Sequence, residues 1–182
     1  TNENNILDRT IKTGEHAIKD VVSTSSPSID IQISSNFERL IYDACKDSNI
    51  VSELMANLKN KSSYILSHEI REYIGSYFSS DTANKKEVEE IISSYFKTHN
   101  IILDPHTAVG VACGKKQKLS EDILVTLSTA HPAKFKETVS EIISDNSFIT
   151  DKVKSLDTLE DHMIIANKNA NDIKKLIDNH VA

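Results

Sequence analysis

Glycine, cysteine and aromatic residues are scarce in this chain of 182 residues. Four glycines occur and they form no run, although enzymes that hold a phosphate on backbone N–H groups usually need a glycine-rich loop. The two cysteines, Cys45 and Cys113, form no CxxC pair, and isolated cysteines favour a reducing, cytoplasmic setting. The sequence therefore offers neither a phosphate-binding loop nor a disulfide framework.

Excess positive charge and long apolar runs are missing as well. With 21 basic and 27 acidic side chains the formal net charge is -6, which argues against a basic face for nucleic acid or an anionic membrane. No apolar run could span a bilayer, and residues 1–5 are polar, unlike the start of a secretory signal. The composition, 38% hydrophobic and 26% charged, predicts one soluble globular domain that binds neither nucleic acid nor membrane.

Apolar residues at helical spacing predict three helices in the first half. A capping-box pattern over residues 35–38 precedes an apolar stripe over residues 37–45. Two further stripes cover residues 66–77 and 88–96, and the polar stretch 79–86 separates them as a loop.

Short apolar runs in the second half predict buried strands at residues 101–103, 123–127 and 163–165. Helical patterns follow the first two runs, and this recurrence of strand, turn and helix is typical of an α/β layer with parallel strands. Ligands collect at the carboxyl ends of such strands. We therefore expect any site to lie within residues 104–110 and 128–134.

Capping residues place the helices of this second half. Asp104 is an N-cap candidate and Pro105 suits the first helical position, while Gly114 is expected to end that helix after residue 113. Pro132 opens another helix that reaches about residue 143. An apolar stripe over residues 173–181 predicts a closing helix.

Three segments place small polar residues, proline and histidine where a turn meets a helix. They read SSPSID at residues 25–30 with SSNFER at 34–39, DPHTAVG at 104–110, and STAHPAKF at 128–135. In this order they resemble threonine synthase, whose sequences carry SPxMDI with SNFERL, DPHTAVG and TAHPAKF near the C-terminus. The resemblance covers nearly the whole chain. Two departures are Ile29, where the family usually has methionine, and Ser25, where leucine is common.

The resemblance implies the C-terminal part of an α/β pyridoxal-phosphate enzyme of fold type II, with short parallel strands, flanking helices and a helical insertion over about residues 48–99. The family converts O-phosphohomoserine and water into threonine and phosphate, with the cofactor as an electron sink. The family's Schiff-base lysine and glycine-rich phosphate cradle lie upstream of the matched region. We therefore assign no catalytic residue here, expect the chain to be inactive alone, and expect the missing N-terminal portion of the enzyme as its partner.

Thr129 is the expected cofactor contact. It follows the predicted strand 123–127, and the resemblance implies a neutral hydroxyl at this position facing the pyridine nitrogen of pyridoxal phosphate. The alternative is that Thr129 caps the helix that Pro132 opens.

Four polar residues are candidates for binding the substrate's phosphate or carboxylate. His131 and Lys134 lie at a predicted helix start, and their alternative is a solvated surface. Asn36 and Arg39 lie at another helix start, where arginine offers a fork that matches phosphate. Their alternative is an exposed helix N-terminus.

Other chemistries find less support. Asp104 and His106 could form an acid–base pair, but we expect Asp104 to be a helix cap and His106 a packed residue instead. The histidines and cysteines lack zinc-type spacing, and no GxSxG elbow is present, so we expect neither a metal site nor a hydrolase triad. The remaining alternative to a part of an enzyme is a degenerate, non-catalytic remnant domain.

Overall fold

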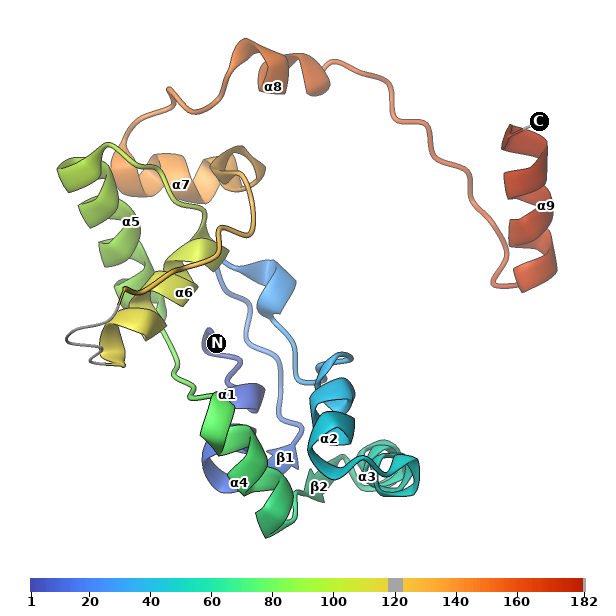
Figure 1. Cartoon of the computed structure of the whole chain (residues 1–182). Coiled ribbons are helices and arrows are strands. Elements are labelled where there is room, and N and C mark those ends of the chain that lie inside the picture. Colours follow the sequence, from blue (N-terminus) through green and yellow to red (C-terminus); the bar gives the residue numbers. More distant parts are fainter. Residues whose placement is uncertain (118–122, 182) are drawn as a thin grey trace. The chain divides into compact units, whose positions relative to one another are not determined.

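The computed structural model describes residues 1–117 and 123–181, which divide into two compact units, Thr1–Ile149 and Thr150–Ala182. The first unit contains α1 (Ile6–Thr13), β1 (Glu15–Ala17), the 3-10 helix η1 (Pro27–Ile29), α2 (Phe37–Cys45), α3 (Ser48–Lys61), β2 (Ser63–Ile65), α4 (His68–Tyr77), α5 (Lys85–His99), α6 (Pro105–Lys116), the 3-10 helix η2 (Pro132–Phe135) and α7 (Lys136–Ile143) (Figure 1). The second unit contains α8 (Asp151–Leu156) and α9 (Ala170–Val181). No helix among the described residues has the length and apolar character needed to cross a bilayer.

The first hydrophobic core joins α2, α3 and α4 to an antiparallel pair of strands, β1 and β2. Ile70 and Ile74 are buried one turn apart on α4, and Ile41 is buried on α2. Local caps fix where the helices begin, because the side chains of Asp47 and Ser67 accept backbone N–H bonds at the starts of α3 and α4. The core consists of Phe37, Ile41, Leu58, Tyr64, Leu66, Ile70 and Ile74.

His16 lies buried in this core. Its ring stacks on Tyr64 with 4.6 Å between ring centroids, and its Nδ1 lies 3.0 Å from the Thr10 hydroxyl oxygen. Its Nε2 has no hydrogen-bond partner within the described part of the chain. Burial, aided by the positive charge of Arg9, lowers the pKa of His16 to about 4. The imidazole is therefore neutral near pH 7.

The second core lies where α5, α6 and α7 pack together (Figure 1). A capping box begins α5: Asn84 accepts the Glu87 N–H, and Glu87 accepts the Asn84 N–H. The buried residues of this second core are Ala83, Val88, Ile92, Ala108, Val109 and Ala112. The small side chains of Ala108 and Ala112 on α6 pack against α5, and this contact holds the start of α6 in the first unit.

Residues 101–103, 123–127 and 163–165 are not strands, which corrects the sequence prediction. A strand needs a neighbour to pair with its N–H and C=O groups. In the described ranges the sheet consists of β1 and β2 alone, and it is antiparallel. The apolar runs were recognised correctly, but they have no strand beside them.

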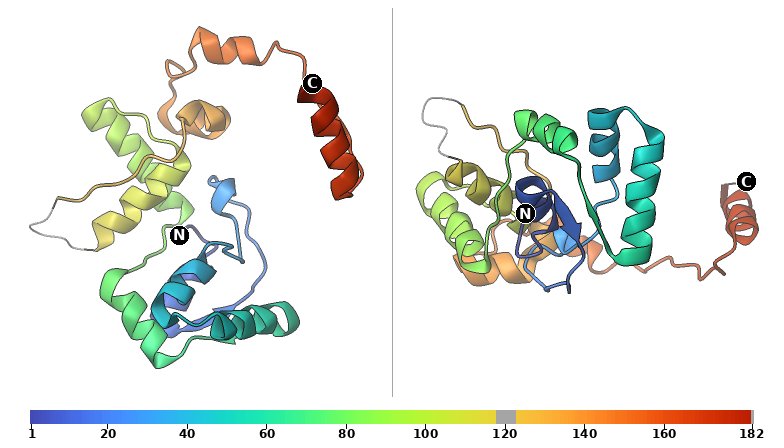
Figure 2. Two further views of the ribbon diagram at one scale, coloured as in Figure 1. Left: turned by 45° about the vertical axis from the view of Figure 1, so that its right-hand side comes forward. Right: turned by 90° about the horizontal axis from the view of Figure 1, so that it is seen from below.

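Residues 123–129 instead run back along α6, as Figure 2 shows. A Cβ added at Gly114 would lie 2.8 Å from a methyl carbon of Leu124, and one added at Gly110 would lie 3.3 Å from the Thr126 methyl. The sequence prediction that Gly114 ends this helix is wrong, because α6 continues to Lys116. Its missing side chain makes room for the neighbouring segment.

The helices that local signals predicted are present. They are α2, α4, α5, the region of η2 and α7, and α9, and Asp104 with Pro105 begins α6 as predicted. The prediction missed α1, α3 and α8, whose apolar patterns are shorter or weaker. The helical insertion over about residues 48–99 stays a prediction.

Candidate functional site

Three sequence segments meet around the buried carboxylate of Asp104. This side chain caps α6: its Oδ1 accepts the backbone N–H of His106 at 2.9 Å and that of Thr107 at 3.4 Å. Its Oδ2 accepts the Thr107 hydroxyl. Asp104 is 1% exposed, so its lone pairs are engaged by the protein and not by water.

His106 joins this carboxylate to the segment at residues 25–30. The Ser28 backbone N–H donates to His106 Nε2 at 3.1 Å, and His106 Nδ1 lies 3.1 Å from Asp104 Oδ1. Because Nε2 accepts, the neutral ring carries its proton on Nδ1 and donates it to Asp104. The same ring packs on Phe135 with 4.7 Å between centroids. The sequence expectation of a capping Asp104 and a packed His106 is confirmed.

Thr129 is exposed at the other side of this cluster. Its backbone N–H donates to Thr107 Oγ1 at 3.1 Å, and the two hydroxyl oxygens lie 3.4 Å apart. The helix-cap position that served as the alternative for Thr129 is taken by His131, whose Nδ1 accepts the Ala133 N–H at 3.1 Å. The Thr129 hydroxyl therefore caps no helix, and among the described residues it contacts Thr107 at 3.4 Å.

The four candidate substrate contacts lie at the starts of α2 and η2. Asn36, Arg39, His131 and Lys134 are all exposed. The His131 ring is engaged by the cap of η2, while no ion pair within the described part of the chain involves Arg39 or Lys134. Asn36 stands at the N-cap of α2 without a side-chain capping bond. Their substrate-binding roles remain predictions.

Comparison with known proteins decides the family. A model of the C-terminal region of threonine synthase matches residues 107–177. The Saccharomyces cerevisiae threonine synthase is 35% identical over 88% of this chain. The crystal structure of pyridoxal-phosphate-bound threonine synthase from Brucella melitensis superposes with a TM-score of 0.86, at 32% identity over 99% of this chain. This chain belongs to the threonine synthase family.

The match to threonine synthases is confined to part of their length. The chain covers 36% of the yeast protein and 39% of the Brucella melitensis structure. The yeast threonine synthase structure gives the same picture, with a TM-score of 0.81, 32% identity, and coverage of 100% of this chain and 41% of that one. The predicted fold class, the C-terminal part of an α/β enzyme of fold type II, is confirmed by these structures, although the described residues form no parallel strands themselves.

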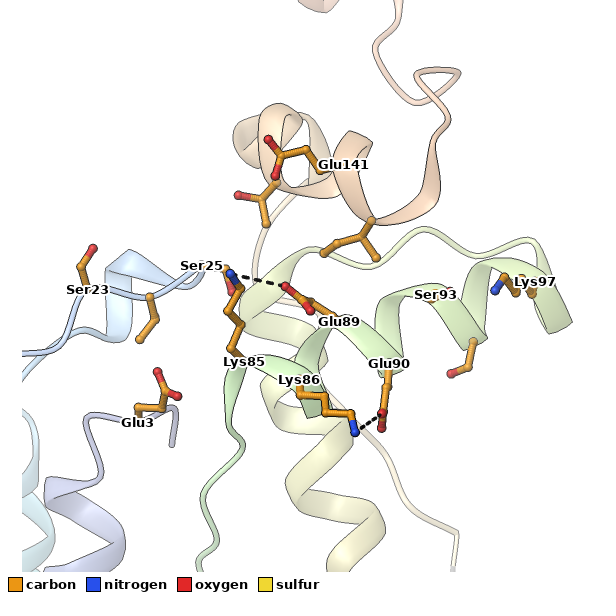
Figure 3. A pocket seen from close by; sticks show the side chains of 14 residues that line it. Glu3, Ser23, Ser25, Lys85, Lys86, Glu89, Glu90, Ser93, Lys97 and Glu141 are labelled. Carbon is orange, nitrogen blue, oxygen red and sulfur yellow. Dashed lines mark ion pairs between the residues drawn. The ribbon is translucent and has the colours of Figure 1, made fainter.

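An open pocket of about 990 Å³ lies elsewhere in the first unit, between the loop at residues 23–25, α5 and α7 (Figure 3). Two ion pairs lie along its α5 wall: Lys85 lies 3.8 Å from Glu89, and Lys86 lies 3.8 Å from Glu90. Glu3, Lys97 and Glu141 line it as well. Ser25, at the start of the segment 25–30, lines it, but none of the candidate cofactor or substrate contacts does, namely Thr129, Asn36, Arg39, His131 and Lys134. The pocket is open to water and carries charges of both signs, so it has no evident ligand.

Sequence reasoning missed a buried polar cluster that shapes the segment at residues 25–30. Asp30 Oδ1 accepts from the side-chain amides of Asn2 at 2.6 Å and Asn4 at 2.9 Å, and from the Thr24 hydroxyl at 2.6 Å. Asn2 and Asn4 are buried, which is unusual for asparagine. Thr107 was missed too, although it lies three residues after the capping Asp104. That spacing is the signal that could have found it.

Proposed function

We propose that this chain forms the C-terminal part of the catalytic region of a threonine synthase. Such an enzyme converts O-phosphohomoserine and water into threonine and phosphate with pyridoxal phosphate. The observation that carries the proposal is the meeting of the three threonine-synthase-like segments at Asp104, with the Thr129 hydroxyl left exposed beside them. The two free cysteines, Cys45 and Cys113, support a cytoplasmic setting.

Thr129 fits the role of partner to the cofactor's ring nitrogen. Pyridoxal phosphate, when bound, withdraws electrons from the substrate's α and β carbons and so stabilises negative charge there. A neutral hydroxyl donates a hydrogen bond to the ring nitrogen without protonating it, and this sets how strongly the ring withdraws electrons. The exposed Thr129 hydroxyl has the chemistry for this contact, and the backbone N–H of Thr129 donates to Thr107 Oγ1.

The exposed cations are the proposed substrate contacts. Arg39 and Lys134 are available to anions because no carboxylate in the described residues neutralises them. Arginine matches phosphate in a forked geometry, and lysine provides a compact charge. With Asn36 and His131 as hydrogen-bonding neighbours, they would hold the phosphate or carboxylate of O-phosphohomoserine. They need substrate, and the rest of the enzyme, to bring them together.

The chain is expected to need the upstream portion of the enzyme. Four glycines at separate positions provide no phosphate cradle, and no lysine of this chain matches the family's cofactor-binding lysine. We therefore expect the pure chain, given pyridoxal phosphate and O-phosphohomoserine, to release no phosphate above a protein-free control. Release above that control would contradict this division of labour.

A chimaera tests the proposed function directly. The matching C-terminal region of the Brucella melitensis threonine synthase is replaced by this chain, and phosphate release is measured with pyridoxal phosphate and O-phosphohomoserine. We expect turnover. A chimaera that folds, as judged by circular dichroism and a cooperative thermal transition, but releases no phosphate would contradict the proposal and favour the degenerate remnant.

Substitutions of Thr129 in that chimaera separate its two interpretations. Thr129→Ala should lower turnover about ten- to a hundredfold, because an unmade buried hydrogen bond costs roughly 1–3 kcal/mol. Thr129→Ser should be nearly neutral, and Thr129→Asp should be worse than serine because a carboxylate favours a protonated ring. If Thr129 only stabilises a helix start, aspartate and serine should both serve, and alanine should lower Tm instead of turnover.

A further inference from the structure

The hydroxyl of Thr107 has one proton, and the structure shows where it goes. The Asp104 carboxylate is buried and accepts it, and a carboxylate accepts more strongly than a neutral hydroxyl. Toward Thr129, Thr107 Oγ1 therefore acts as the acceptor, and it receives the Thr129 backbone N–H at 3.1 Å. The hydrogen bonds run in one direction, from Thr129 through Thr107 to Asp104.

The segment that carries Thr129 depends on α6 for its position. Among the described residues no strand flanks it, and it touches α6 at Gly114 through Leu124 and at Gly110 through Thr126. These two contacts are apolar and end in methyl groups, which tolerate sliding. The bond from the Thr129 N–H to Thr107 is directional, so it sets where the segment stops along the helix.

We propose that Thr107 is a positioning residue for Thr129, with Asp104 holding Thr107 in the required rotamer. The pair fixes the Thr129 backbone. The Thr129 hydroxyl donates to Thr107 Oγ1 only across 3.4 Å, so its proton can turn to a better acceptor, the cofactor's ring nitrogen. The contact between the Thr129 hydroxyl and the cofactor rests on the proposed function. The anchoring of the Thr129 backbone does not, because it concerns this chain alone. A purely structural Thr107, serving only to stabilise the start of α6, would change stability but would not change the order of Thr129.

The first test uses this chain by itself and measures hydrogen–deuterium exchange of the Thr129 amide by NMR. Thr107→Val keeps the shape but removes the acceptor, so exchange at Thr129 should rise about tenfold once corrected for global stability, since one directional hydrogen bond is lost. Thr107→Ser should restore the slow exchange. The matched control is Thr126→Val, the same exchange of hydroxyl for methyl on the same segment, which should leave the Thr129 amide unchanged. Unchanged exchange in Thr107→Val would overturn the proposal whatever the protein's activity.

The second test uses the chimaera and reads the absorption spectrum and affinity of bound pyridoxal phosphate. Thr107→Val should shift the absorption maximum in the same direction as Thr129→Ala and weaken binding about three- to tenfold, while Thr107→Ser should do neither. If exchange at Thr129 rises but both variants keep the wild-type spectrum and affinity, the anchoring stands and the proposed cofactor contact fails. If Thr129→Ala changes the spectrum and Thr107→Val does not, the cofactor contact stands and the positioning role is overturned.

Discussion

Apolar side chains are buried in one region of this chain and exposed in another. Ile41 and Ile74, in the first core, are 0% and 2% exposed, whereas Ile123 and Leu127 are 93% and 78% exposed. Residues 123–127 are the more continuously apolar of the two, so the difference in exposure lies in what surrounds each stretch. The helices of the first core have each other and the β1–β2 pair as partners, while residues 123–127 have one face of α6 on one side and water on the other.

The first core finds its packing partners within this chain, whereas residues 123–127 lack a partner for their backbone groups among the described residues. A helix satisfies its own backbone and needs only apolar contacts to be stable, but a strand also needs a neighbour for its hydrogen bonds. An exposed apolar segment with unpaired N–H and C=O groups is a template for association. In the family fold we expect that neighbour from the upstream part of the enzyme, which makes residues 123–127 the proposed joint between the two portions.

The largest expected change in stability comes from a substitution in the first core. Ile41→Ala should lower the free energy of unfolding by about 2–5 kcal/mol, because it leaves a cavity in a closely packed core. The matched exchange Ile123→Ala removes the same atoms from an exposed site and should change it by no more than about 0.5 kcal/mol. Urea denaturation of both variants measures the difference. Equal losses would mean that residues 123–127 are buried in solution.

A pH dependence arises in the same core from His16. Its pKa is about 4 in the folded chain and 6.5 as a model value, so the unfolded state binds more protons between these values. The free energy of unfolding should therefore be highest above pH 6.5 and fall as the pH drops toward 4, by about 3 kcal/mol in total. Denaturation of wild type and His16→Phe at pH 7 and pH 5 measures it. The wild type should lose more stability than the variant, and parallel losses would contradict this source.

Glycine substitutions compare a free helix surface with the one covered by residues 123–129. Gly75→Ala in α4 should stabilise by about 0.5–1 kcal/mol, because a Cβ there meets no atom within 4 Å and alanine lowers the entropy of the unfolded chain. Gly114→Ala should gain less, because its Cβ would lie 2.8 Å from a Leu124 methyl carbon and that side chain would have to rotate away. Thermal denaturation compares the two. Equal stabilisation would show that residues 123–129 do not rest on α6.

The smallest expected effect on stability concerns the exposed segment itself. Ile123→Lys combined with Leu127→Lys should change the unfolding free energy by no more than about 0.5 kcal/mol per site, since both side chains are in water. Self-association of the pure chain and binding of a hydrophobic dye should fall, because charges protect an exposed edge. Analytical ultracentrifugation provides the measurement. A wild-type chain that is a stable monomer without dye binding would contradict this assignment.

Much of the local structure was determined by the sequence alone. Asp104 before Pro105 predicts the start of α6, and the stripes of α2, α4 and α5 predict those helices, because caps and spacing act within one or two turns. The resemblance of three short segments identified the family, which the comparisons confirm.

Only the tertiary structure decided how these pieces are used. It turned the predicted strand at residues 123–127 into a segment lying on α6, and it turned Gly114 from an expected helix end into the contact for Leu124. It also joined Ser28, Asp104 and Thr129 in one cluster of hydrogen bonds. Pairing and packing of this kind depend on residues far apart in the chain. A pattern read along the sequence shows which groups need a partner, while the fold determines which partner they find.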